Sequence, residues 1–548
     1  MMLDWWHIPL IPLLFWLLMM RWPSVSNWIW LAPLPGLFLL WHGPANIELP
    51  MLWPGAALGI DSPVNHYFLL LSIVLWSVAS LFASVTQRND VHRLRFWSFW
   101  LWSMTGNLLL VIALDPASFY VGFTLMSLAA YGLVAHQPGP LPRQAGRLYL
   151  QLAVLGEMLI YAGLILRVHE TGGLLSFSDW QQPIGWLTAV CLLTGFGLKA
   201  GFWPLHLWLP LAHPVAPAAA SAVLSGAMLK AGILGIWQFI PADTPTTVAL
   251  GPVVFFIGLF GAFYAVVAGL LQQQAKTVLA FSSVSQMGYL LMIIAMFWMT
   301  GDATSSLIIL LAMYGLHHAV AKAALFMGAG LASSRQLSPW HWGLMTLPAL
   351  ALAGLPLTTG ASVKYLLKDA VSDSMFVLSL PLLSIGSMAT ALLLIRALLL
   401  MKQSQQNISK NARAPEAVAL SSWLVLSLAP IVIPLMVDEF RHQLTQTMQL
   451  QALTGLLWPI ILATVIAAIV SRLSLKTSFK AKLFAGRWLS LRLRYCLIHF
   501  PVPEWVIRLK LDGWRKVERS INKFSSVGTL PITIGLTFLM MLSWTMLF

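Results

Sequence analysis

The stretch GFGLKAGFWPLHLWLPLAHP at residues 195–214 decides how this chain folds, because it places polar and helix-breaking residues inside an apolar segment. It contains Lys199, two histidines and three prolines, yet its other residues are those of a membrane-spanning helix. A charged side chain at the centre of a bilayer costs about 2.5–3.5 kcal/mol, so it requires a partner or a water-filled cavity. We expect Pro204 and Pro210 to break the helix beside Lys199, and the break to make room for water.

The composition identifies a polytopic membrane protein. Of the 548 residues, 59% are hydrophobic and only 9% are charged, which is too few solvated side chains for a soluble chain of this length. Apolar runs recur along the whole chain, so we predict an all-α integral membrane fold with about sixteen transmembrane helices. The predicted spans are 8–20, 27–42, 66–86, 98–114, 117–135, 148–167, 184–211, 216–239, 248–272, 277–299, 305–332, 343–367, 375–401, 417–437, 450–470 and 528–547. The first run lacks the basic flank and cleavage site of a signal peptide, so we expect it to remain in the mature protein.

The net charge of +14 could indicate a nucleic-acid partner. In a membrane protein, however, the location of the basic residues matters more than their sum. They fall in alternate loops, which should therefore be cytoplasmic, and an even number of spans puts both termini on the periplasmic side of a bacterial inner membrane. We expect no nucleic acid as a partner. The basic loops contain Arg21; Arg88, Arg93 and Arg95; Arg143 and Arg147; Lys276; Arg335; and Lys402, Lys410 and Arg413.

The segment 472–527 supplies most of the positive charge. It has thirteen Lys or Arg against three acidic residues, a net charge of +10, and it alternates these with Trp, Leu and Ile. This pattern predicts an amphipathic helix along the cytoplasmic membrane surface. It would serve either as a tether between two spans or as a helix that clamps a partner.

Two cysteines, Cys191 and Cys496, lie far apart without metal-binding spacing. This spacing suggests neither an iron–sulfur site nor a disulfide framework, and we expect no cofactor and no metal in this chain. The absence of P-loop, HExxH and GxSxG motifs argues against a nucleotide site or a hydrolase. A haem-bearing bundle is disfavoured because no second pair of histidines matches the first.

Ionisable residues occur at membrane depth. His318 and Lys322 are four residues apart and share one helical face with Tyr314, whereas His317 points elsewhere and reads as a core histidine. Lys368 and Arg396 lie near predicted helix ends, where long side chains reach the interface.

Burial favours the neutral form of lysine, and a nearby carboxylate favours its charged form. A row of Lys and His can therefore relay protons, with one lysine–carboxylate pair that controls when its lysine holds or releases a proton. The predicted relay residues are Glu157, Lys199, Lys230, His318, Lys322 and Lys364.

Four segments together resemble the antiporter-like membrane subunits of respiratory complex I and their relatives. The segments are 195–232, TVLAFSSVSQMGYLLM at 277–292, GLHHAVAKAALFMGAG at 315–330 and GLPLTTGASVK at 354–364. The relatives include hydrogenase-4 type formate hydrogenlyase subunits, multisubunit sodium/proton antiporters and a subunit of inorganic-carbon uptake systems. PLAHPVAPAAASAVLSGAMLKAG is most similar to the hydrogenase-4 type subunit.

The resemblance implies a core of fourteen helices, built as two inverted five-helix repeats with broken seventh and twelfth helices. It assigns Lys199 to the first broken helix, Lys230 to the eighth helix, and His318 with Lys322 to the central relay. Lys364 would pass protons to the outside from the twelfth helix. The chain then divides into 1–110 (N-terminal spans), 111–240 (first repeat), 241–402 (second repeat), 403–471 (two spans), 472–527 (amphipathic segment, which would brace neighbours) and 528–548 (last span).

One position departs from the family pattern. A glutamate of the fifth helix usually accompanies the lysine of the broken helix, but GFTLMSLAAYG at 122–132 has Thr124 there. Glu157 takes that role if its helix faces Lys199; otherwise the chain is a scaffold that no longer conducts.

The resemblance implies a subunit without redox activity of its own, in a complex with other membrane subunits and a peripheral redox arm. Proton or cation-coupled carbon uptake with a soluble zinc protein, and sodium/proton exchange, remain the alternatives.

Overall fold

The computed structural model describes residues 3–300, 305–406 and 416–476. The predicted last span, Cys496 and all but the first residues of the predicted amphipathic segment lie outside the described residues.

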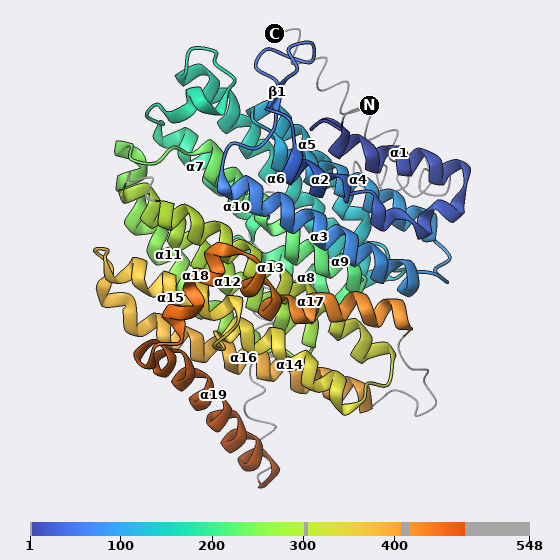
Figure 1. Ribbon diagram of the computed structural model, residues 1–548, viewed down its shortest axis with the longest axis vertical. Coiled ribbons are helices and arrows are strands. Elements are labelled where there is room, and N and C mark those ends of the chain that lie inside the picture. Colours follow the sequence, from blue (N-terminus) through green and yellow to red (C-terminus); the bar gives the residue numbers. More distant parts are fainter. Residues whose placement is uncertain (1–2, 301–304, 407–415, 477–548) are drawn as a thin grey trace, which may run out of the picture.

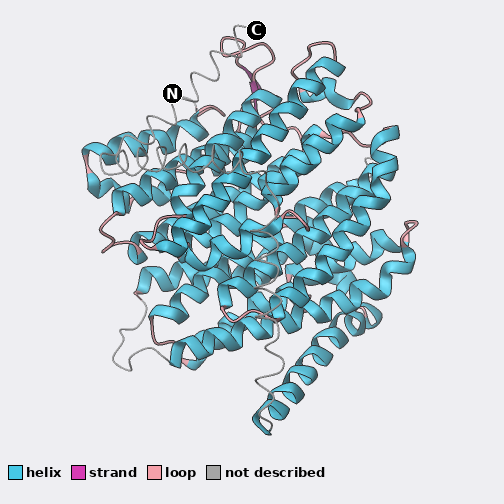
Figure 2. Ribbon diagram, turned by 180° about the vertical axis from the view of Figure 1, so that it is seen from behind, coloured by secondary structure: helices cyan, strands magenta, loops and turns pink. Residues whose placement is uncertain are grey.

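The described chain is almost entirely helical. Figure 1 follows it from blue to brown, and Figure 2 shows the same bundle from behind. The α-helices are α1 (His7–Arg21), α2 (Pro35–His42), α3 (Pro63–Thr86), α4 (Arg93–Ile112), α5 (Pro116–Val134), α6 (Pro140–Glu170), α7 (Trp186–Ala200), α8 (Leu209–Val215), α9 (Ala218–Val223), α10 (Leu229–Phe239), α11 (Pro245–Leu270), α12 (Ala275–Thr300), α13 (Ser305–Ser334), α14 (Pro339–Ala353), α15 (Thr359–Ser372), α16 (Leu380–Gln406), α17 (Ala417–Met436), α18 (Asp438–Thr447) and α19 (Leu450–Lys476).

Short elements connect these helices. An antiparallel pair of strands, β1 (Ile47–Glu48) and β2 (Ala57–Leu58), projects from one end of the bundle (Figure 1). The short helical turns are η1 (Pro23–Asn27), η2 (Ile29–Leu31), η3 (Phe177–Gln181), η4 (His206–Trp208), η5 (Leu224–Met228) and η6 (Val377–Ser379).

Within the described residues, ten helices are long and apolar enough to cross a membrane, and three shorter apolar helices accompany them. Each of the fifteen spans predicted before residue 476 falls on a helix or on helices joined by a break. The all-α membrane fold is therefore confirmed, while the number of sixteen spans stays a prediction.

Helix α13 forms the centre of the bundle and is nearly all buried. It packs against α3, α9, α12, α14, α15, α16 and α17, which come from both ends of the sequence. At the other extreme, α19 is largely uncovered, and Figure 1 shows it projecting from one end of the bundle. The central position of α13 brings its polar side chains within reach of several other helices.

Pairs of glycines let neighbouring helices approach closely. A methyl group on Gly195 of α7 would lie 2.7 Å from the carbonyl oxygen of Gly156 of α6, and a methyl on Gly258 of α11 would lie 2.6 Å from that of Gly288 of α12. Small residues at crossings are the common means by which helices associate in membranes. The glycine pair of α6 and α7 brings the helix that carries Glu157 against the helix that carries Lys199.

Two spans are broken, each at a glycine in the left-handed region. Helix α7 ends at Ala200, and Gly201 follows with φ 71°. Helix α14 ends at Ala353, and Gly354 follows with φ 101°. The predicted break beside Lys199 is confirmed, but it begins at Gly201, before the two prolines that were expected to cause it. Pro210 instead lies in the first turn of α8.

A third irregularity, the turn η5, separates α9 from α10 without ending the helix. Its five residues, Leu224–Met228, form a single π-turn, in which the hydrogen bonds span one residue more than in an α-helix. Such wide turns frequently occur at functional sites. Lys230 is the second residue after η5, in the first turn of α10.

Candidate functional site

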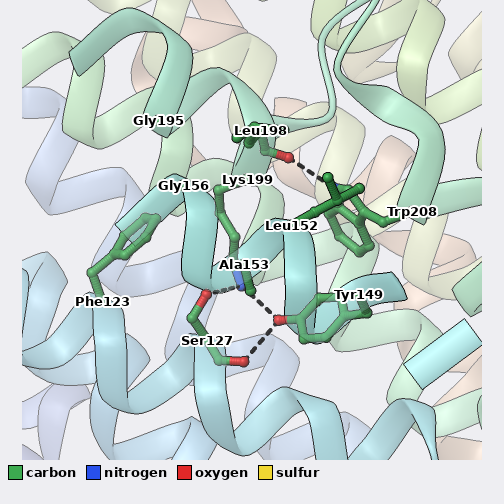
Figure 3. A pocket seen from close by; sticks show the side chains of 10 residues that line it. All are labelled: Phe123, Ser127, Tyr149, Leu152, Ala153, Gly156, Gly195, Leu198, Lys199 and Trp208. Atoms are coloured by element: carbon green, nitrogen blue, oxygen red, sulfur yellow. Dashed lines mark hydrogen bonds between the residues drawn. The ribbon is translucent and has the colours of Figure 1, made fainter. Parts of the chain in front are cut away.

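Lys199 lies in a small buried pocket between α5, α6 and α7. Its ammonium group donates hydrogen bonds to Oγ of Ser127 at 2.9 Å and to the hydroxyl of Tyr149 at 3.0 Å. Figure 3 shows both bonds, and the bond from the Tyr149 hydroxyl to the carbonyl oxygen of Ser127. The pocket has a volume of ≈ 10 Å³, which is room for one water molecule. Two neutral hydroxyl groups therefore hold the Lys199 amine beside a space of the size of one water molecule.

Glu157 follows Gly156, one of the residues of α6 that line this pocket. It is buried, interacts electrostatically with Lys199, and lies beside the hydroxyl of Ser127. Its Oε1 atom has no hydrogen-bond partner in the described part of the chain. The expectation that the helix of Glu157 faces Lys199 is thus met, and Ser127 lies within reach of both charged groups.

Thr124 lies one turn from Ser127 on α5, and both side chains are buried. Ser127, and not Thr124, contacts Lys199. The position without a carboxylate is thus adjacent to the hydroxyl that contacts the lysine.

The centre of the bundle contains a second group of buried polar side chains. Nζ of Lys230 lies 2.6 Å from Nδ1 of His318 and donates to the carbonyl oxygen of Ser225 at 2.7 Å, inside the π-turn. Lys322 donates to the carbonyl oxygen of Leu279 at 2.8 Å. Both lysines and His318 are at most 2% exposed and interact electrostatically with one another. Three of the predicted relay residues therefore form one cluster.

Lys364 lies just after the second break. It donates to the carbonyl oxygen of Ala353, the last residue of α14, at 2.9 Å and to Oγ of Ser387 at 3.0 Å. The break therefore supplies a backbone acceptor to a lysine at membrane depth, as a broken helix can.

His317 links Lys364 to the central cluster. Its Nδ1 atom lies 2.8 Å from Oγ1 of Thr359, at the start of α15, and the ring interacts electrostatically with both Lys364 and Lys230. From its position beside His318, His317 was expected to be a core histidine that points elsewhere. It does occupy another face of α13 than His318, but this face points to the second break.

The six predicted site residues form two groups. Lys230, His318 and Lys322 lie in the central cluster, to which His317 links Lys364. Glu157 and Lys199 make a separate pair. Sequence reasoning also missed the neutral partners Ser127, Tyr149, Thr359 and Ser387. A hydroxyl residue in an apolar helix is too common to single out before the helix that it faces is known.

Snorkelling was expected for Lys368 and Arg396. That expectation stays a prediction; Lys368 donates to the carbonyl oxygen of Gly455 at 3.4 Å, and Arg396 to that of Gln272 at 3.3 Å. Both side chains are part-buried. Over the described ranges no group of three or more His, Cys, Asp or Glu side chains could hold a metal ion.

Residues 113–393 match a family described as NADH:quinone oxidoreductase/Mrp antiporter, transmembrane. Hydrogenase-4 component B of Escherichia coli (strain K12) is 31% identical over 343 residues, which cover 58% of this chain and 51% of that protein. A protein of Staphylococcus haemolyticus (strain JCSC1435) described as an antiporter subunit, mnhA2, is 27% identical over 459 residues, which cover 76% and 56%. The chain thus spans little more than half the length of these relatives.

Two solved structures share the fold. The Mrp complex from Dietzia sp. DQ12-45-1b contains a chain that superposes with a TM-score of 0.67 at 18% identity, over 83% of this chain and 99% of that one. The membrane-bound sulfane sulfur reductase, an archaeal respiratory membrane complex, gives a TM-score of 0.66 at 20% identity, over 78% and 75%.

Proposed function

The chain belongs to the NADH:quinone oxidoreductase/Mrp antiporter membrane family, and on that premise we propose that it conducts protons across a membrane as one subunit of a larger complex. The relay residues would be Glu157, Lys199, Lys230, His318, Lys322 and Lys364. The chain itself would contribute no cofactor and no redox step.

The observation that carries this proposal is the cluster around Lys230. Two lysines and two histidines, all at most 2% exposed, lie in one electrostatically connected group at the centre of a membrane protein. No carboxylate takes part in the polar contacts described for this cluster, so its members cannot all be charged at once without strong repulsion. A proton added at one member therefore favours release from another, and this is the behaviour that a relay needs.

The pair of Lys199 and Glu157 would act as the gate. A carboxylate near an ammonium favours the charged form of the lysine, and separation of the two favours its neutral form. The hydroxyl of Ser127 lies within reach of both groups and can take over the contact with either. Movement of Glu157 would then switch Lys199 between holding and releasing a proton.

A redox-driven complex of the complex I or hydrogenase-4 type is the assembly that we favour. It would supply other membrane subunits and a peripheral redox arm, and the similarity to hydrogenase-4 component B supports this choice. The alternatives are a multisubunit sodium/proton antiporter, which the similarity to mnhA2 favours, and a carbon-uptake system with a soluble zinc protein.

The finer architecture is also part of the proposal. The two left-handed glycine breaks, each close to a buried lysine, support two inverted repeats with broken seventh and twelfth helices in a core of fourteen. We place the complex in a bacterial inner membrane, with both termini periplasmic.

Two experiments test the function. The complex is first purified through a tag on this chain in mild detergent, and its partners are identified and analysed for metals. Iron–sulfur and hydrogenase or quinone-reducing subunits support the redox-driven pump, and a lone zinc protein supports carbon uptake instead.

Proton translocation is then measured in inverted membrane vesicles, where Lys199→Ala and Lys322→Ala should abolish it while leaving the complex assembled. Normal translocation by both variants would refute the relay.

A further inference from the structure

His213 is a buried histidine outside the relay described above. It lies in α8, directly after the first break, and is 0% exposed. Neither of its ring nitrogens has a hydrogen-bond partner among the residues that the structure describes. A buried polar group is normally hydrogen-bonded, and an exception calls for an explanation.

The surroundings of His213 connect a surface lysine to a central one. Lys276, half-buried at the start of α12, donates to the carbonyl oxygen of Ala216 at 2.8 Å, at the end of the helix that carries His213. Lys322 contacts the carbonyl oxygen of Leu279, one turn beyond Lys276 on the same helix. The two amines thus lie at adjacent positions along α12, and His213 interacts electrostatically with both.

The ring of His213 is also positioned to carry charge. It stacks on Phe326 of α13 with ring centroids 4.3 Å apart and an angle of 16°. The face of an aromatic ring attracts a cation. Phe326 therefore stabilises the protonated form of the His213 imidazole. A neutral imidazole has one nitrogen that accepts and one that donates, so it can take up a proton on one side and release one on the other.

We propose that His213 is the step by which protons from the surface at Lys276 reach Lys322. This deepens the proposed proton conduction and rests on it. In the forward direction, one ring nitrogen accepts a proton at the Lys276 side, and the other releases a proton toward the neutral Lys322 amine. No bond other than these N–H bonds is formed or broken.

The test compares two variants of the intact complex in inverted vesicles. His213→Gln keeps a polar side chain of similar size but cannot relay a proton, so translocation should fall about 100-fold, the low end of what a positioned proton-transfer group contributes. His341→Gln in α14 is the matched control, because this histidine is also buried but bonds to Ser338 at the start of its own helix, outside the relay. It should retain translocation within a few-fold of wild type.

Chemical rescue separates a relay from a structural role. In His213→Ala, added imidazole should restore a large part of the lost rate, since it supplies the same titratable group, whereas His213→Gln, which leaves less space, should respond weakly. Wild-type rates in His213→Gln, or a loss in His213→Ala that imidazole does not restore while the complex is present at normal amounts, would overturn the proposal. A wild-type complex that translocates no protons would instead contradict the proposed function.

Discussion

Nζ of Lys230 lies 2.6 Å from Nδ1 of His318, so one hydrogen bond joins α10 to α13 inside the bundle. A charged ammonium group can only donate, so Nδ1 of His318 must be the acceptor whenever Lys230 is charged. The neutral imidazole then carries its proton on Nε2, which has no partner in the described chain. The pair therefore holds one proton between its two nitrogens, with a second available at Nε2 for transfer onward.

This pair should behave as one functional unit. Lys230→Ala and His318→Gln should each lower proton translocation by about 100-fold. The double variant should be little worse than either one, because residues that act as a unit have non-additive effects. Vesicle assays on the three variants, with complex amounts measured by immunoblot, check this. If the fold-loss in the double variant equals the product of the two single fold-losses, the two side chains act independently.

Proton translocation should require a carboxylate near Lys199, but this carboxylate should also work from another helix. Glu157→Gln removes the negative charge near Lys199 and should strongly reduce translocation. Thr124 lies one turn from Ser127 on α5, which packs against α6, so adding Thr124→Glu to Glu157→Gln places a carboxylate on α5 instead of α6. We expect the double variant to recover much of the rate. Its failure, with Thr124→Glu alone active, would show that the carboxylate must sit on α6.

The crossing of α6 and α7 should not tolerate a methyl group. In Gly195→Ala the new carbon would meet the carbonyl oxygen of Gly156 and the side chain of Ile160 at 2.7 Å, so the helices must separate at a cost of about 1–3 kcal/mol. Gly343→Ala in α14 is the matched control, because nothing lies within 4 Å of the added carbon. Thermal unfolding in detergent should show a lower midpoint for the first variant alone. Equal midpoints would refute the close approach.

A loop contact should make stability depend on pH. Nε2 of His136, after α5, lies 3.0 Å from Oδ2 of Asp90, after α3. Burial lowers the pKa of His136 from its ordinary 6.5, although Asp90 opposes this. Burial raises the pKa of Asp90, but hydrogen bonds from His136 and the His92 backbone N–H outweigh it and leave that pKa below 3.8.

Both groups thus bind protons more weakly when folded than when unfolded. Their contribution to stability is complete above the unfolded pKa values and is lost as the pH falls through the folded ones. For His136 the loss begins as the pH falls below about 6.5. The unfolding midpoint should therefore drop between pH 7.5 and 5.5, and His136→Gln should show a smaller drop. An unchanged slope in that variant would locate the dependence elsewhere.

The sequence was sufficient for the all-helical membrane fold and for the burial of the cations. Hydropathy located Lys199, Lys230, Lys322 and Lys364 at membrane depth, because an ionisable residue in an apolar run is visible without any knowledge of its neighbours. The first break was likewise expected from its prolines. Its start at Gly201 was missed, since a glycine in an apolar helix is too common to signal a left-handed residue.

The side chains that contact these cations could not be predicted from the sequence. That Ser127 and Tyr149 contact Lys199 depends on which faces of α5, α6 and α7 meet, and this is fixed by glycine crossings rather than by local pattern. His317 was judged from its face of α13 alone. Its contact with Thr359 required the position of a helix that begins 42 residues later.

The π-turn η5 sets how α10 is rotated about its axis relative to α9, within the span that the two helices form. An α-helix turns by about 100° per residue, so the extra residue of one wide turn rotates everything after it by that angle relative to everything before it. The small residues of α9 thus pack on α3 and α13, while Lys230 is turned to face His318. A one-residue deletion within Leu224–Met228 would restore a regular helix and rotate Lys230 out of register, with no charged residue altered.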